Sequence, residues 1–193
     1  LPVGKIQFVW GEAFVFHRDP MVGYRVQSGL PLYPGDIIRT RAAAWVQCRL
    51  IDGSRIALAP DTTLTVRQSI CSSARKTCAS TIYLKYGDAR FKLKRLADLQ
   101  SYEFKVQTDL ASASAEYADF IVNANTEATG FVALEKSRME VAGLSQPEEV
   151  TYINDLQKTT LSDKVISPTV EALSGEELEL ILAVFYPVPP SPL

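Results

Sequence analysis

The stretch LIDGSRIALAPDTTLTV, from Leu50 to Val66, decides the fold of this chain. Apolar and polar residues alternate on both sides of Asp52-Gly53-Ser54, which is the pattern of two β-strands joined by a turn. Strand side chains point alternately to opposite faces, so Ile56 and Leu58 lie on one face of the second strand. The stretch therefore predicts a hairpin with one buried face.

The length of this turn determines which side chains meet across the hairpin. A two-residue loop at Asp52-Gly53 would place Leu50 opposite Arg55, and one strand face would then bury an arginine. A three-residue loop, Asp52 to Ser54, pairs Leu50 with Ile56 and keeps the apolar residues together. The sequence therefore predicts an odd loop with glycine or serine near the left-handed region. A bend between two coils of a solenoid would keep the same phase.

Short strand-like segments follow one another along most of the chain, and turns recur about every ten residues. The segment from Ser28 to Asp36 is dense in glycine and proline and predicts turns. This pattern indicates an all-β fold. Beyond the hairpin, the predicted strands are 5–10, 13–17, 24–27, 37–40, 45–51, 81–86, 89–93, 103–107, 119–124, 129–135 and 138–141.

The character of the sequence changes after Gly143, so we expect an all-β domain over residues 1–143 and a C-terminal extension over 144–193. Ser174 and Glu177 have the spacing of a helix capping box, and the chain closes with a proline-rich end. The short amphipathic helix either packs back on the domain, the more common outcome, or docks on a neighbour. Its apolar face is a candidate partner surface formed by Leu178, Ile181, Leu182 and Phe185.

Composition excludes several classes of protein. The chain has 193 residues, of which 47% are hydrophobic and 22% charged, as in a globular domain with a real core. Its net charge of -2 argues against a nucleic-acid surface. The longest wholly apolar run, Leu180 to Tyr186, is far shorter than the ~20 residues of a membrane span. The start at Leu1 is what we expect of a matured or trimmed chain.

Cys71 and Cys78 bracket a polar stretch that predicts a loop closed by a local disulfide. Zinc would require more cysteine or histidine nearby. A disulfide would place the protein in an oxidising compartment, and we expect Cys48 to be a buried free thiol. Arg75 and Lys76, inside the bracketed stretch, are a candidate contact for an acidic partner, although a solvated loop is the more common case.

No residue set predicts catalysis. His17 is the only histidine, and nothing in the sequence singles out a nucleophile to pair with it. The aspartates lie at turns or strand ends, where their side chains bond backbone N–H groups. The glycines lack the lysine and helix of a phosphate loop. We therefore expect no enzyme activity, no cofactor and no metal site.

The segment SGLPLYPGDIIRTRAAAWVQCRLIDGSRIALAPDTTLTV, Ser28 to Val66, closely resembles the first half of the FecR domain. YLKYGDARFKL and the stretch from Phe104 to Gly143 resemble the second half more weakly. The chain departs from the family at Tyr117-Ala118-Asp119, where many members carry Arg-Gly-Thr, and at Lys136-Ser137, near a late family glycine. The resemblance covers roughly residues 5–143. The matching signature residues are Gly29, Leu32, Gly35, Asp36, Thr40, Asp52, Gly53, Ser54, Pro60, Thr62 and Leu64.

This resemblance implies a β-helix-like or solenoid-like all-β module in the bacterial periplasm or envelope. The best-known members relay a signal from an outer-membrane iron transporter to a sigma factor, and other members are secreted or lipid-anchored. We expect a non-enzymatic interaction or signalling module that binds another envelope protein, by strand addition or through the tail helix. The alternative is a peptidoglycan- or glycan-binding module that uses Trp10, Trp45 and the tyrosines. Whether sigma-factor signalling is involved stays open.

Overall fold

The computed structural model describes residues 1–18, 21–94, 99–162 and 168–186. These residues form strands and one short helix, which confirms the all-β prediction. Sheet A contains, in spatial order, β4 (Pro31–Leu32), β1 (Gly4–Trp10), β6 (Trp45–Leu50), β7 (Arg55–Leu58), the second half of β9 (Thr77–Lys92), β12 (Asp119–Ala124), β13 (Thr129–Ala133), β16 (Gln157–Leu161) and β17 (Glu171–Ala172). Sheet B contains β3 (Met21–Arg25), β2 (Ala13–Arg18), β5 (Ile37–Thr40), β8 (Thr63–Ser72), the first half of β9, β10 (Ser101–Gln107), β11 (Ala111–Ala115), β14 (Arg138–Gly143) and β15 (Val150–Asn154).

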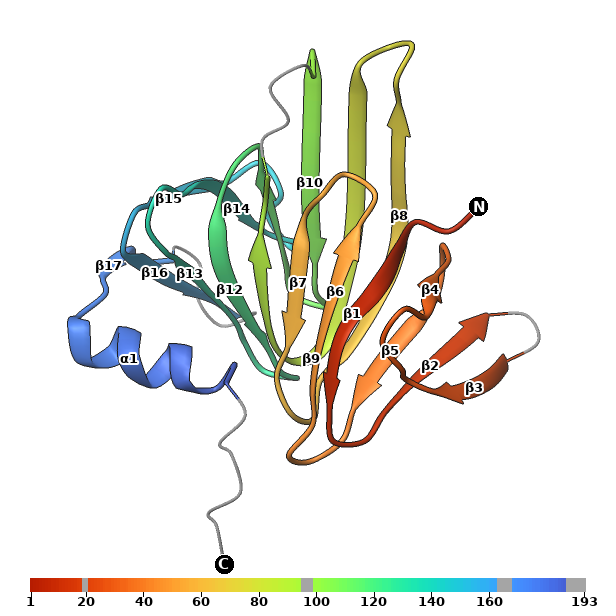
Figure 1. Ribbon diagram of the computed structural model, residues 1–193. Helices are drawn as coiled ribbons and strands as arrows, with labels where there is room; N and C mark the ends of the chain where they lie inside the picture. Colours follow the sequence, from red (N-terminus) through yellow and green to blue (C-terminus); the bar gives the residue numbers. More distant parts are fainter. Residues whose placement is uncertain (19–20, 95–98, 163–167, 187–193) are drawn as a thin grey trace, which may run out of the picture.

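In both sheets, the N-terminal strands lie at one edge and the C-terminal strands at the other. Figure 1 shows this progression as a passage from the red N-terminal strands on one side to the blue C-terminal helix on the other. Within the described residues, every strand pair is antiparallel except β9 with β10. Successive coils of a parallel β-helix would instead pair in parallel. The solenoid-like winding is therefore not confirmed, and hairpins that alternate between two layers take its place.

The strand β9 joins the two layers because it belongs to both. Its first part pairs with β8 and β10, and the part from Gly87 to Lys92 pairs with β12. Gly87 has a φ of +96°, and a Cβ at this position would lie 2.4 Å from Oγ1 and 2.7 Å from Cα of Thr62. Only glycine allows the strand to turn here and to approach Thr62 so closely.

The core lies between the sheets and is centred on aromatic rings. Phe91 of sheet A meets Phe104 of sheet B with 5.9 Å between ring centroids, and it stacks on Phe120 at 5.0 Å. Edge-to-face and offset-stacked geometries of this kind are the favourable ones. Ile153 and Leu161 lie in the same core, so strands beyond residue 143 extend both sheets.

The hairpin at Asp52 has the predicted kind of turn in a different register. Leu50 donates its backbone N–H to the carbonyl of Ser54 over 2.9 Å, so the three-residue loop is 51–53, and Gly53 is left-handed with a φ of +84°. Ile56 pairs with Cys48, not with Leu50. The apolar faces still coincide because the parity is unchanged. The predicted pairing is wrong because Ser54 is not a loop residue: it is hydrogen-bonded to Leu50, and its side chain is buried like that of Asp52.

The predicted loop between Cys71 and Cys78 is present but shorter than the bracketed stretch. β8 and β9 continue past both cysteines, which face one another across the hairpin, and only residues 73–76 form the turn. The disulfide itself is present, as the sequence predicts. The β8–β9 hairpin is long enough to project from the body of the molecule (Figure 1).

The helix α1 (Gly175–Ala183) follows its N-cap Ser174, and both hydrogen bonds of the predicted capping box are present. The residues around the helix form a second, small apolar cluster on the outer face of sheet A, with Ala59, Ile121 and Leu134. The helix therefore packs back on its own domain. In the residues that the structure describes, no helix has the length and apolar character needed to span a membrane.

Candidate interaction surface

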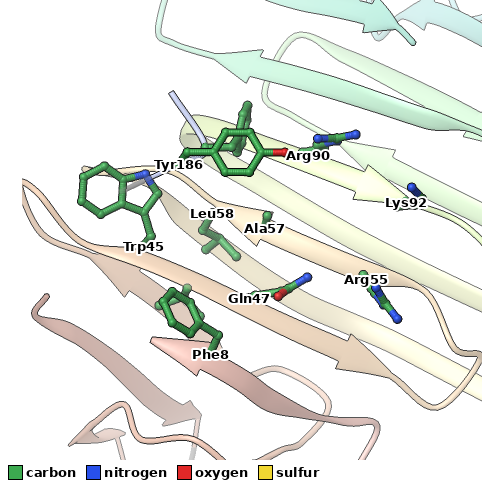
Figure 2. A pocket seen from close by; sticks show the side chains of 11 residues that line it. Phe8, Trp45, Gln47, Arg55, Ala57, Leu58, Arg90, Lys92 and Tyr186 are labelled. Carbon is green, nitrogen blue, oxygen red and sulfur yellow. The ribbon is translucent and has the colours of Figure 1, made fainter. Parts of the chain in front are cut away.

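The outer face of sheet A is covered by α1 over β7, β12 and β13, and is open over β1 and β6. A groove of about 440 Å³ lies at the boundary between the two regions. Figure 2 shows side chains from β1, β6, β7 and β9 along its floor, with the end of the helical segment beside them. The open part of this face, with the groove, is named the open face below.

Aromatic side chains dominate one part of the open face. Trp10 and Trp45 are cross-strand neighbours on β1 and β6, and Phe8 lies opposite Gln47. Phe8 and Trp10 are 43% and 42% exposed. Large aromatic groups that share one strand face and remain in solvent are the composition expected at the centre of a binding surface.

The end of the helical segment forms the other wall of the groove. The indole Nε1 of Trp45 donates a hydrogen bond to the carbonyl of Val184 over 2.8 Å. Phe185 is buried in the small apolar cluster, and the Tyr186 hydroxyl points toward Arg90 in Figure 2. The Trp45 bond ties a strand to a residue 139 positions later in the chain, so the groove depends on the helix being docked.

The charged part of the groove contains one strong ion pair. The guanidinium of Arg90 donates two hydrogen bonds to the Asp119 carboxylate, at 2.8 and 2.9 Å. Hydrogen bonding to Asp119 raises the pKa of Arg90 above its ordinary value, against the opposing effect of burial. Lys92 also lies 3.5 Å from Asp119. Arg55 lines the same groove, and the described residues place no carboxylate within ion-pair distance of it.

The signature residues Asp52 and Ser54 lie away from this groove, inside the protein. The Asp52 carboxylate accepts hydrogen bonds from the Ser54 backbone N–H at 2.8 Å, from Ser80 Oγ at 2.9 Å and from Tyr102 Oη at 3.1 Å. Burial is the main cause that raises the pKa of the Tyr102 phenol well above its ordinary value, and Asp52 adds to it. These contacts join the hairpin turn of sheet A to strands β9 and β10 of sheet B.

The remaining signature residues also hold turns together. Asp36 accepts a hydrogen bond from the Tyr33 backbone N–H at 2.8 Å, and Gly35 beside it is left-handed. Thr40 Oγ1 donates to the Ala59 carbonyl at 2.7 Å and accepts from the Thr62 backbone N–H at 2.8 Å. Pro60 lies in the same connection, where its carbonyl accepts a hydrogen bond from Thr62 Oγ1.

His17 is hydrogen-bonded to Asp36 through Nδ1, with 2.6 Å between Nδ1 and Oδ1. This pairing, which the sequence did not predict, has the geometry of the base and acid of a triad. Tyr24 and Tyr33 flank the imidazole ring, and no contact to a serine or cysteine nucleophile is present among the described residues. Those residues also contain no group of three or more histidine, cysteine or acidic side chains placed to hold a metal ion.

The predicted partner residues fall in two separate places. Arg75 and Lys76 are exposed at the tip of the β8–β9 hairpin, where a role in binding stays a prediction. The apolar helix residues contact the apolar outer side chains of sheet A; Phe185 is buried there, and Leu178, Ile181 and Leu182 are half-buried. Their role as a partner surface stays a prediction.

The open face was missed at the sequence level. Its residues alternate with core residues on β1, β6, β7 and β9, so each segment carries the local signal of an outward-facing position. What the sequence does not give is the lateral order of the strands. Phe8, Arg55 and Lys92 come from distant segments, and they lie in one groove only because β1, β6, β7 and β9 are neighbours.

Comparison with known proteins gives the family and the fold. The family model described as FecR protein matches residues 36–137. Two crystal structures of a proposed anti-sigma factor from Parabacteroides distasonis ATCC 8503 are similar in fold, with TM-scores of 0.59 and 0.60 and sequence identities of 18% and 17%. Each match covers 76% of this chain, but only 64% and 63% of those proteins. No curated protein matches this chain, and no match points to a glycan ligand.

Proposed function

The chain belongs to the FecR family, and on this premise we propose that it is a non-enzymatic regulatory module of the bacterial envelope that binds another protein. The observation that carries the proposal is the open face, where exposed aromatic side chains adjoin a groove on an otherwise well-packed sheet. The proposed partner is an envelope protein that docks on this face while α1 stays packed on sheet A.

The family departure at Tyr117-Ala118-Asp119 supports a specific role for this groove. Asp119 stands within a triplet that is Arg-Gly-Thr in many members, and here it binds Arg90 at the groove edge. Its backbone N–H also donates a hydrogen bond to Ser137 Oγ over 2.9 Å. Of the residues that distinguish this chain from its family, Asp119 therefore lies at the edge of the proposed docking site, through its ion pair with Arg90.

The proposed location is extracytoplasmic. Envelope association is a property of the family, and the Cys71–Cys78 disulfide is of the kind that persists in oxidising compartments. We include in the proposal that the full-length protein is held at the envelope, with a lipid anchor as one form of attachment. Fractionation of cells that express the full-length gene tests this part, and a cytoplasmic protein with free thiols would contradict it.

The regulatory role can be tested in the parent bacterium with two matched double variants. Phe8→Ser with Trp10→Ser removes two exposed apolar side chains from β1 of the open face, and Val150→Ser with Tyr152→Ser removes two from β15 of sheet B. We expect the first variant to change the transcript levels of a discrete gene set at unchanged protein abundance, and the second to leave them as in the wild type. Wild-type transcript profiles for both variants would contradict the proposal.

A further inference from the structure

We propose that the open face recognises an acidic peptide segment of its partner, through a row of cations that crosses four neighbouring strands. This inference rests on the proposed function and specifies the chemistry of the partner. Lys5 on β1 lies directly opposite Arg49 on β6. Arg49 lies opposite Arg55 on β7, and Arg55 lies opposite Lys92 on β9. These four residues, Lys5, Arg49, Arg55 and Lys92, are named the cation ladder.

Within the part of the chain that the structure describes, three of the four cations in the ladder have no carboxylate at ion-pair distance. Among the described residues, Lys92 is its only member within ion-pair distance of a carboxylate, and that carboxylate is already bound by Arg90. Like charges directly opposite one another on neighbouring strands are destabilising. The formal net charge of the chain is -2, so the ladder is not part of a generally basic surface.

The immediate surroundings add positive charge to the ladder. A Cβ built on Gly53 would lie 4.0 Å from a terminal nitrogen of Arg49 and 3.8 Å from Cδ of Lys94. The side chains of Arg49 and Lys94 therefore approach the same turn between β6 and β7. The ladder and Lys94 form a concentrated cationic patch, whose field attracts and orients an anionic partner.

The shape of the surface fits an extended chain. The groove beside α1 is lined by Arg55 and Lys92, and a second hollow of about 520 Å³ is lined by Lys5 and Arg49. The ladder links the two hollows. Four strands spaced about 4.8 Å apart give it a length of roughly 14 Å, which is the span of four or five residues of an extended peptide.

The aromatic side chains distinguish a peptide from other polyanions. Phe8 and Trp45 line one end of the groove and Arg55 the other, with Gln47 between Phe8 and Arg55 in Figure 2, so one groove offers both apolar contact and positive charge. A partner segment with apolar residues followed by acidic residues would use both. Nucleic acid or an anionic membrane would use mainly the charge, and the acidic net charge of the chain disfavours both.

The test uses the whole chain and a fluorescein-labelled synthetic peptide in which Leu-Phe-Leu precedes five glutamates. Fluorescence anisotropy measures binding to the wild type and to the double variant Arg49→Gln with Arg55→Gln. The matched control, Lys105→Gln with Arg138→Gln, removes two cations from β10 and β14 of sheet B. We expect the ladder variant to lose about tenfold in affinity, and the control to stay within about twofold of the wild type.

Thermal unfolding of the free proteins gives a second readout that peptide binding does not influence. Because Arg49 and Arg55 are opposed like charges, we expect the ladder variant to melt at a higher temperature than the wild type, and the control variant to melt no higher. A ladder variant that is less stable than the wild type would mean that the two arginines stabilise the fold, and it would contradict a role in ligand binding.

Three further outcomes would overturn the inference. The first is equal binding of a peptide in which glutamines replace the five glutamates. The second is tighter ladder-dependent binding of a twelve-nucleotide single-stranded DNA, and the third is tighter binding of vesicles rich in phosphatidylglycerol. Failure of the glutamate peptide to bind would remove the acidic-segment inference alone. The transcript experiment above decides the regulatory function separately.

Discussion

Replacement of Asp52 by alanine should destabilise the protein strongly, because one buried carboxylate organises five polar groups. Tyr102 and Ser80 each donate their single hydroxyl proton to Asp52, so Ser54 Oγ must donate to Tyr102 and Ser69 Oγ to Ser80. Two chains of hydrogen bonds, called arms below, therefore end on this carboxylate: one runs from Ser69 through Ser80, and the other from Ser54 Oγ through Tyr102. The Ser54 backbone N–H donates to the same carboxylate. The five residues are 9% exposed or less.

The magnitude follows from these contacts. Asp52→Ala removes the acceptor of three hydrogen bonds, each worth about 1.5–3 kcal/mol when one partner is charged. Because losses of this kind are not additive, we expect a decrease of about 4 kcal/mol in the free energy of unfolding. Asp52→Asn should cost about half as much, since its amide can donate to Tyr102 and Ser80 if both arms reverse direction. Tyr102→Phe, which removes one arm, should cost about 1–2 kcal/mol.

The assay is guanidinium chloride unfolding followed by the fluorescence of the two tryptophans. A cost below about 1 kcal/mol for Asp52→Ala, at an unchanged denaturant slope, would refute the argument that Asp52 and Ser54 specify the fold. A cost for Asp52→Asn equal to that for alanine would refute the reversal of the arms. If Asp52→Ala does not fold, the asparagine and Tyr102→Phe variants still decide the question.

Three further outcomes are expected from the rest of the molecule. Gly87→Ala should cost about 3 kcal/mol or more by urea unfolding, because its Cβ would overlap Thr62 at a positive φ, whereas Gly130→Ala, with no atom nearer than 3.8 Å, should change stability by less than about 0.5 kcal/mol. Burial raises the pKa of Cys48 to about 12, so mass spectrometry should find it unmodified by iodoacetamide at about pH 8 until the protein unfolds; modification of the native protein would contradict its burial. Hydrogen bonding to Lys158 lowers the pKa of Glu177 from 4.5 to about 2, so its stabilisation is present above pH 4.5 and is lost as the pH falls toward 2. The fluorescence of Trp45, whose indole is hydrogen-bonded to the end of the helical segment, should change over the same pH range. Glu177→Gln should abolish that change.

The sequence predicts local structure well where alternation and capping are strong. The strands around the Asp52 hairpin, the disulfide and the α1 capping box all follow from nearest-neighbour patterns. The prediction fails where local signals are weak. β11 (Ala111–Ala115) consists of alanine and serine, which have little β propensity, and it becomes a strand only because β10 and β14 pair with it on both sides.

The order of the strands in the sheets is harder to predict from the sequence, because it depends on contacts between distant segments. The burial of the Asp52 turn cannot be predicted, since nothing near it in sequence reveals Tyr102 and Ser80 as hydrogen-bond partners. In the same way, Lys5 and Lys92 are 87 residues apart in sequence but lie on the same row of sheet A. The outward-facing positions of each strand were predictable, whereas the surface that they form together was not.

Site-specific photo-crosslinking in living cells is the sharpest test of whether the protein binds its partner through the open face of sheet A. A photoreactive phenylalanine analogue would replace Phe8 on the open face, Tyr152 on sheet B, or Arg75 at the hairpin tip. We expect a crosslink from position 8 to one envelope protein, with an acidic segment at the crosslinked site. This crosslink should be lost with Arg49→Gln and Arg55→Gln. A partner crosslinked from position 75 or 152, and not from position 8, would contradict binding through the open face.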